Sequence, residues 1–161
     1  MVPDSRLILH LLEDMTSPRN RLLIAAQEFT TAFADKKDVE TLLSHFSTTQ
    51  QPTVLEHGEP SLAPFLGRPF TGLDGVRRYF ETVMTVLSYD DMVFSEFVVD
   101  PETRKVALKG KARFTWISTN QSWDETFAYI VDFDQENKVI RDQIWGDTGA
   151  AYLASKGKLL S

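Results

Sequence analysis

The sequence predicts a single α+β domain, in which helices from the first half of the chain pack against a sheet built from the second half. Three observations support this fold class. The length of 161 residues suits one domain with a hydrophobic core. Apolar residues recur with a helical period up to about Leu87 and alternate with polar residues after Tyr89. No repeat, low-complexity tract or long linker divides the chain, so we expect a helical extension over residues 1–16, one domain over 17–155 and a tail over 156–161.

Composition and charge narrow the possible partners. A net charge of -6 would repel phosphate backbones, so nucleic acid is not an expected partner. The absence of cysteine excludes disulfides, thiolate nucleophiles and thiolate metal sites. The N-terminal leucines are interrupted by Asp4, His10 and Glu13, unlike a signal peptide, and no apolar run is long enough to cross a bilayer. We therefore expect a cytoplasmic protein without a membrane partner.

Capping residues and apolar stripes predict the helices. Ser17-Pro18 begins a helix that ends near Asp35, because a hydroxyl cap followed by proline suits a first turn. Asp38 caps a shorter helix, and Asp147 caps a last one. Two further helices are predicted at Ser5–Met15 and Gly72–Leu87. The apolar stripe of the first helix consists of Leu7, Ile8, Leu11, Leu12 and Met15.

Alternating patterns predict the strands, which are expected at Pro52–His57, Met92–Val99, Lys105–Ser118, Ser122–Phe133 and Val139–Trp145. Between the first strand and the helix that follows lies a loop over Gly58–Thr71. Loops of this length in compact domains are often lids or binding loops.

The alternation also predicts which side chains share the inner face of the sheet. A two-residue turn at Asn120-Gln121 would pair Trp116 with Glu125, Phe114 with Phe127, Ala112 with Tyr129 and Gly110 with Val131. The next hairpin would pair Phe133 with Ile140, Val131 with Asp142 and Tyr129 with Ile144. Because Gly110 and Ala112 are small, we expect space for a ligand beside them. Lys109, Lys111, Arg113 and Trp145 would face outward.

The order of elements and three local segments resemble the nuclear-transport-factor-2-like superfamily, in its SnoaL-like and ketosteroid-isomerase-like branch. The segments are Ala34–Glu40, Phe70–Phe80 and Asn137–Asp142, and the resemblance covers about residues 18–154. It implies a cone-shaped, curved, mixed or antiparallel sheet wrapped by three main helices (a cystatin-like α+β roll), with the short N-terminal helix outside it. It also implies one small-molecule pocket, no cofactor and a homodimer formed through the outer face of the sheet.

The resemblance suggests site residues by position. Ketosteroid isomerases carry a carboxylate base on the first strand, and His57 aligns with it. Their oxyanion hole includes an acid on a later strand, near which Tyr129 falls. The Asp-Arg-Asp set of limonene epoxide hydrolases would fall on Gly110, Ala112 and Ile144, so that mechanism is not expected. The expected catalytic residues are His57, Tyr129, Asp142 and Glu125. The expected ligand contacts are Leu55, Phe114, Trp116, Phe127, Ala112, Gly110 and Ile144.

Each catalytic candidate has a structural alternative. His57 would be a hydrogen-bonded histidine at a strand end, and Tyr129 a packed aromatic residue. Glu125 and Asp142 lie in apolar series, and burial of an unpaired carboxylate is unfavourable by several kcal/mol. They would therefore be acid–base groups with raised pKa values, or partners of an Arg, Lys or Trp N–H. No zinc spacing or calcium-loop glycine is present, so no metal is expected.

Two functions remain open. The first is a cofactor-free isomerase, cyclase or dehydratase that acts on a hydrophobic carbonyl compound by acid–base chemistry. The second is a non-catalytic dimeric module that binds a ligand or another protein. An open cavity lined by His57 and a carboxylate favours the enzyme. A cavity filled by Phe114, Phe127 and Trp116 favours the adaptor.

Overall fold

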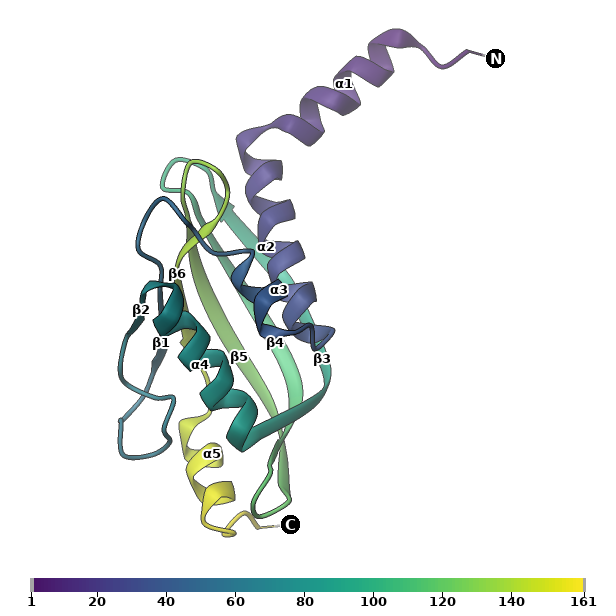
Figure 1. Cartoon of the computed structure of the whole chain (residues 1–161). Coiled ribbons are helices and arrows are strands. Elements are labelled where there is room, and N and C mark those ends of the chain that lie inside the picture. The colour runs from purple at the N-terminus through teal and green to yellow at the C-terminus, as the bar shows by residue number, and fades with distance from the viewer. Residues whose placement is uncertain (1, 161) are drawn as a thin grey trace.

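A computed structural model describes residues 2–160 of the chain. Its centre is one six-stranded sheet with the strand order β2-β1-β6-β5-β4-β3, which curves without closing into a barrel (Figure 1). Helices α2, α3 and α4 cover one face of the sheet, and α5 lies at one end of the sheet, next to the C-terminus (Figure 1). The predicted α+β cone, wrapped by three main helices, is therefore confirmed.

The helices form where the capping residues indicate. Their bounds are α1 Ser5–Thr16, α2 Pro18–Ala34, α3 Val39–Leu43, α4 Gly72–Val86 and α5 Thr148–Ser155. The Ser17 hydroxyl accepts a hydrogen bond from the N–H of Asn20 at 3.2 Å. Asp38 and Asp147 cap α3 and α5 in the same way, at 2.8 and 2.9 Å. Each of these side chains satisfies a backbone donor that the first turn leaves free.

The strands are β1 Thr53–His57, β2 Phe70–Thr71, β3 Leu87–Asp100, β4 Lys105–Trp116, β5 Gln121–Phe133 and β6 Val139–Trp145. β1 runs parallel to β6 and antiparallel to β2, so the sheet is mixed. β3 starts five residues before the predicted Met92, because α4 passes directly into it. Register irregularities in β3, with a positive φ at Asp91 and Glu96, interrupt the alternation that would have shown its full length.

The predicted pairing of β4 with β5 is wrong by four residues. Trp116 lies opposite Gln121, Phe114 opposite Trp123, Ala112 opposite Glu125 and Gly110 opposite Phe127. A four-residue turn over 117–120 replaces the predicted two-residue turn, and Asn120 closes it with a φ of 55°. Because the shift is an even number of residues, every side chain keeps the predicted face.

The pairing of β5 with β6 is confirmed for Val131 with Asp142 and for Tyr129 with Ile144. A bulge after Asp132 places Phe133 opposite Val139, so the predicted pair with Ile140 is wrong. The two faces differ as predicted. Ile144 is 4% exposed on the inner face, whereas Trp145 is 39% exposed on the outer one.

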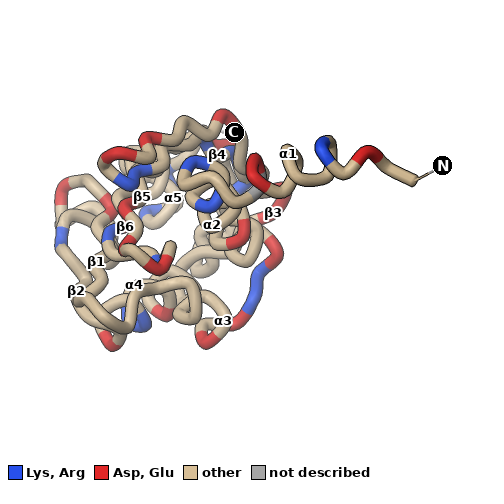
Figure 2. Tube along the Cα trace, turned by 90° about the horizontal axis from the view of Figure 1, so that it is seen from above, with Lys and Arg blue, Asp and Glu red and all other residues tan. Residues whose placement is uncertain are grey.

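Helix α1 extends away from the rest of the protein and does not cover the cone (Figures 1 and 2). Of its predicted stripe, Leu7, Ile8, Leu11 and Leu12 are between 42% and 59% exposed. The side chain of Met15 lies outside the described part of the structure. Among residues 2–160, no helix combines the length and apolar character that a bilayer crossing requires.

Candidate functional site

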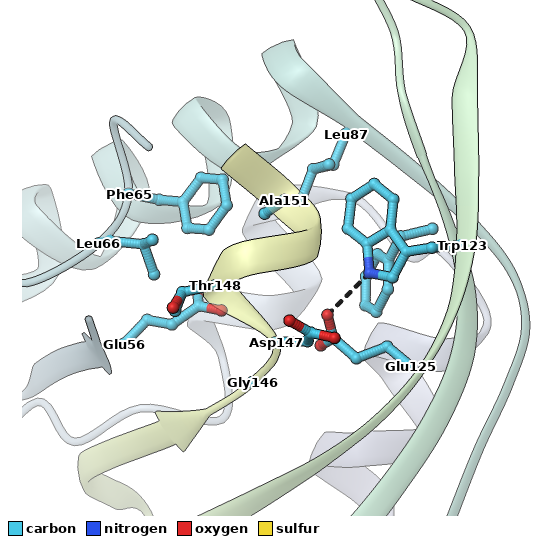
Figure 3. A pocket seen from close by; sticks show the side chains of 11 residues that line it. Glu56, Phe65, Leu66, Leu87, Trp123, Glu125, Gly146, Asp147, Thr148 and Ala151 are labelled. Atoms are coloured by element: carbon cyan, nitrogen blue, oxygen red, sulfur yellow. Dashed lines mark hydrogen bonds between the residues drawn. The ribbon is translucent and has the colours of Figure 1, made fainter. Parts of the chain in front are cut away.

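A small cavity lies between α5 and the neighbouring ends of β1 and β5 (Figure 3). Its volume is about 30 Å³, room for one or two water molecules. Acidic and aromatic side chains dominate its wall. The lining residues are Glu56, Phe65, Leu66, Leu87, Phe114, Trp123, Glu125, Gly146, Asp147, Thr148 and Ala151. The cavity combines several carboxyl groups with apolar walls, as ligand sites commonly do, so we take it as the candidate functional site.

Glu56 is the deepest titratable group that lines the cavity. It alternates with Leu55 along β1 and therefore shares the inner face with Val54, which is fully buried. The hydroxyl of Tyr79, on α4, donates a hydrogen bond to Glu56 Oε2 at 3.0 Å. Burial raises the pKa of Glu56 to about 8, and the charges of Glu125 and Asp142 add to this against the opposing effect of the Tyr79 hydrogen bond.

Asp142, on β6, is a second buried carboxyl near Glu56. It is 1% exposed, and burial raises its pKa to about 8. Among the described residues its Oδ1 has no hydrogen-bond partner. A buried polar atom without a partner is unfavourable, so Asp142 is stable in this place chiefly as the neutral acid.

Glu125, on β5, lines the cavity beside Asp147 and Trp123 (Figure 3). The indole N–H of Trp123 donates to Glu125 Oε1 at 2.9 Å, and the backbone N–H of Asp147 also donates to the carboxylate. Burial raises the pKa of Glu125, while these two donors lower it. A Cβ placed on Gly146 would lie 2.9 Å from Glu125 Oε2 and 3.8 Å from Glu56 Oε1. The missing side chain of Gly146 therefore leaves the two carboxyl groups open to a shared space.

His57 does not lie in this cavity. It follows Glu56 on β1 and points to the outer face, where its Nε2 is 3.0 Å from Gln143 Oε1. Its ring stacks on that of Trp145, with centroids 4.4 Å apart. The predicted pocket position of His57 is wrong because β1 joins β6 in a register that turns Val54 and Glu56 inward. For the same reason Leu55 faces outward.

Tyr129 is on the inner face, 6% exposed, but it is not part of the cavity wall. Its ring packs against Phe94 and Phe127, and burial raises its pKa well above the usual value. It lies close enough to Asp142 and Glu56 for their charges to affect it. The predicted role of Tyr129 thus stays a prediction.

Phe114 is the one predicted ligand contact that is also among the lining residues of the cavity. The space expected beside Gly110 is filled, because a Cβ on Gly110 would lie 2.2 Å from Phe127 Cε2. Ala112, Trp116 and Ile144 lie elsewhere in the hydrophobic core. Glu56, Tyr79 and Trp123 were not among the site residues predicted from the sequence. Glu56 could have been found from its position two residues after Val54, because residues two apart in a strand share a face and Val54 is the apolar residue that a buried face would contain.

No group of three His, Cys, Asp or Glu side chains within residues 2–160 is arranged to hold a metal ion. The cavity wall instead combines carboxyl groups with Tyr79 behind them. Carboxyl groups with pKa values near neutrality can exchange protons with a bound molecule at physiological pH.

The curved sheet and the three covering helices have the nuclear-transport-factor-2-like fold. Solved structures share it. An NTF2-like protein of unknown function from Burkholderia pseudomallei is 16% identical, over 83% of this chain and 96% of its own, with a TM-score of 0.71. A putative isomerase from Bacillus subtilis is 8% identical, over 91% and 100%, with a TM-score of 0.74. TerC, co-crystallised with polyporic acid, is 18% identical, over 87% and 99%, with a TM-score of 0.71. No protein-family model and no curated protein matches the chain.

Proposed function

We propose that this protein is a cofactor-free acid–base enzyme of the isomerase or cyclase type, acting on a hydrophobic small molecule that carries a carbonyl group. The main support is Glu56, a carboxyl group at the floor of the cavity with a pKa raised to about 8 and an orienting hydrogen bond from Tyr79. A carboxyl group with a pKa near the ambient pH can both accept a proton from carbon and return it.

The chemistry follows from the two buried carboxyl groups. Glu56, when ionised, takes a proton from the carbon next to the substrate carbonyl, and an enolate forms. Asp142 lies behind the cavity wall, close to Glu56, and when neutral it is a hydrogen-bond donor for the enolate oxygen once the wall has moved to admit the ligand. The proton held by Glu56 then returns to a different carbon, which completes an isomerisation. Similarity in fold to a putative isomerase supports a reaction of this type.

A cavity of about 30 Å³ is too small for such a ligand, so part of its wall has to move. The part held least firmly is α5, which buries only Ala151 and Ala154. Small side chains contribute little apolar area, so displacement of α5 breaks few favourable contacts. The loop that supplies Phe65 and Leu66 lies on the other side of the same opening. In the proposed mechanism, α5 moves outward as the ligand enters and closes over it again.

The test is solvent deuterium exchange at the α-carbon of a panel of hydrophobic cyclic ketones, followed by NMR. The native protein is expected to accelerate exchange for at least one ketone. Glu56→Gln is expected to slow that exchange by about 10²–10⁴-fold, because a general base is lost. The matched control is Glu59→Gln, which changes an exposed carboxyl group three residues away. Equal exchange by the native protein and Glu56→Gln would contradict the role of Glu56.

One observation favours a second function, a non-catalytic ligand-binding or adaptor module. Phe127 occupies the space beside Gly110 that a ligand would otherwise use. An adaptor predicts no exchange with any ketone of the panel.

We further propose that two copies pair through the outer face of the sheet. Val93 and Val98 are 60% and 67% exposed on β3, and Trp145 is 39% exposed on β6. Sedimentation equilibrium is expected to give a dimer mass for the native chain and a monomer mass for Val98→Asp, because a charge on this face opposes apolar burial. Val2→Asp, at another exposed valine, is the control. A monomeric native chain would contradict the proposal.

A further inference from the structure

The titratable side chains that line the cavity are all carboxylic acids. Glu56, Glu125 and Asp147 are its titratable groups, and no Lys, Arg or His is among its lining residues. Asp142 lies behind the cavity, close to Glu56, and as the neutral acid it adds no charge there. Basic side chains line two neighbouring hollows: one contains Lys111 and Arg113 and also borders Glu125, and the other contains Lys36 and Lys37 and also borders Leu87. The cationic groups are thus outside the cavity.

The acids are arranged from the mouth of the cavity to its floor. Asp147 is exposed at the start of α5, where its Oδ1 caps the helix at 2.9 Å from the N–H of Ala150. Glu125 is partly buried and comes next, and Glu56, whose pKa burial raises furthest, is the most buried of the three. The position that a Cβ of Gly146 would take is within 3.8 Å of a carboxyl oxygen of both Glu125 and Glu56. A ligand that enters here therefore passes close to both groups.

Glu125 differs from Glu56 in how its charge is held. Two N–H groups, from Trp123 and from the backbone of Asp147, donate to Glu125 and favour its ionised form. Glu56 receives one hydrogen bond, from a neutral hydroxyl group. Burial acts against these donors and raises the pKa of Glu125, so the two N–H groups are what favour its anion near the entrance, whereas Glu56, with a single hydroxyl donor, is the group that exchanges its proton.

We propose that the cavity selects for ligands that carry no anionic group, and that Glu125 is the residue that determines this specificity. The proposal rests on the proposed function, since it concerns the ligand of the same site. Like charges about 5 Å apart at an effective dielectric constant of about 20 repel strongly enough to weaken binding roughly 100-fold. The substrate is therefore a neutral carbonyl compound, such as a ketone or an ester, and not its free carboxylic acid or phosphate ester.

The experiment compares the binding of three matched probes: 2-tetralone, a tetralone carboxylate and the methyl ester of that carboxylate. Ligand-observed NMR at pH 7.5 and low salt measures the affinity of each. The native protein is expected to bind the ketone and the ester at least about 100-fold more tightly than the carboxylate. Raising the salt concentration is expected to reduce this preference, because the mouth of the cavity is open to solvent.

Variants assign the effect to a residue. Glu125→Gln keeps the size and the hydrogen-bonding oxygen of the side chain, and it is expected to tighten binding of the carboxylate about tenfold while the ester is unaffected. Glu59→Gln, outside the cavity, is expected to change neither. Equal affinity of the native protein for carboxylate and ester would overturn the proposal, as would failure to bind any neutral probe. An unchanged preference in Glu125→Gln would overturn the role of Glu125.

The two experiments can contradict the proposed activity and the proposed ligand selectivity independently. If the neutral probes bind selectively but no deuterium exchange occurs, the proposed enzyme activity is wrong and the selectivity for neutral ligands stands. If exchange occurs on the free carboxylate as fast as on its ester, the activity stands and the selectivity is wrong.

Discussion

Replacement of Asp142 by asparagine is expected to raise the free energy of unfolding above pH 7 by a few kcal/mol and to flatten its dependence on pH. Asp142 is 1% exposed, its Oδ1 has no partner among the described residues, and burial raises its pKa to about 8. Ionisation of this group inside the fold is therefore unfavourable, and Asn keeps the shape of the side chain without a charge.

The direction of the pH dependence follows from the two pKa values of Asp142. In the unfolded chain an aspartate has a pKa of about 3.9, so it releases its proton well before the folded protein does. Between about pH 4 and pH 8 the folded state holds one more proton than the unfolded state, and stability falls by about 1.4 kcal/mol per pH unit for each such group. Glu56, with a pKa raised to about 8, contributes in the same direction. The native protein is thus expected to be most stable near pH 4–5 and to lose stability as the pH rises to 8.

Urea unfolding curves between pH 4 and pH 9 measure this effect. Asp142→Asn is expected to match the native protein near pH 4 and to exceed it at pH 8, with a slope reduced by about half because Glu56 remains. The control is Asp35→Asn, which removes an exposed aspartate and is expected to leave the slope unchanged. A native protein whose stability rises between pH 5 and pH 8 would contradict the buried neutral state of Asp142.

Gly110→Ala is expected to destabilise the fold by about 3 kcal/mol, at the upper end of the range for overpacking. The added Cβ would lie 2.2 Å from Cε2 and 2.4 Å from Cζ of Phe127. The Phe127 ring cannot move aside easily, because Phe94 and Phe114 each lie 5.8 Å from it and Tyr129 lies 5.6 Å from it, centroid to centroid. Thermal and urea unfolding measure the loss.

A double-mutant cycle tests the cause. Phe127→Leu shortens the side chain and is expected to recover about half of the stability lost in Gly110→Ala, because the collision is relieved. The matched control is Gly149→Ala in α5, where the Cβ would meet only Asp147 Oδ1 at 3.6 Å. That variant is expected to be neutral or slightly stabilising, since alanine favours helix more than glycine does. Additive effects of the Gly110 and Phe127 substitutions would contradict the contact between them.

Local patterns were enough to place most elements of the fold. Ser17-Pro18, Asp38 and Asp147 mark helix starts, because a cap acts on backbone groups only two or three residues away. Alternation in β4 and β5 assigned the inner and outer faces correctly even though their pairing was wrong by four residues. The face to which a strand residue points alternates with a period of two, so a register shift of four residues leaves every side chain on the same face.

The site depended on information that local patterns do not contain. The strand β1 is five residues long, and both of its alternating series include apolar and polar residues, so its facing could not be decided from Val54, Leu55, Glu56 and His57 alone. The parallel pairing of β1 with β6, whose partner residues lie 88 positions apart in the chain, turned Glu56 inward and His57 outward.

By itself, the sequence determined that the chain has an α+β fold, with helices in its first half and strands in its second, because caps and hydrophobic periods are local properties. The cone shape was implied by the family resemblance. Only the tertiary structure decided that Glu56 is the carboxyl group of the cavity, that Tyr79 orients it and that Phe127 fills the space beside Gly110. These contacts join residues far apart in the chain, and they depend on the register of the strands and on how the side chains share the space inside the cone.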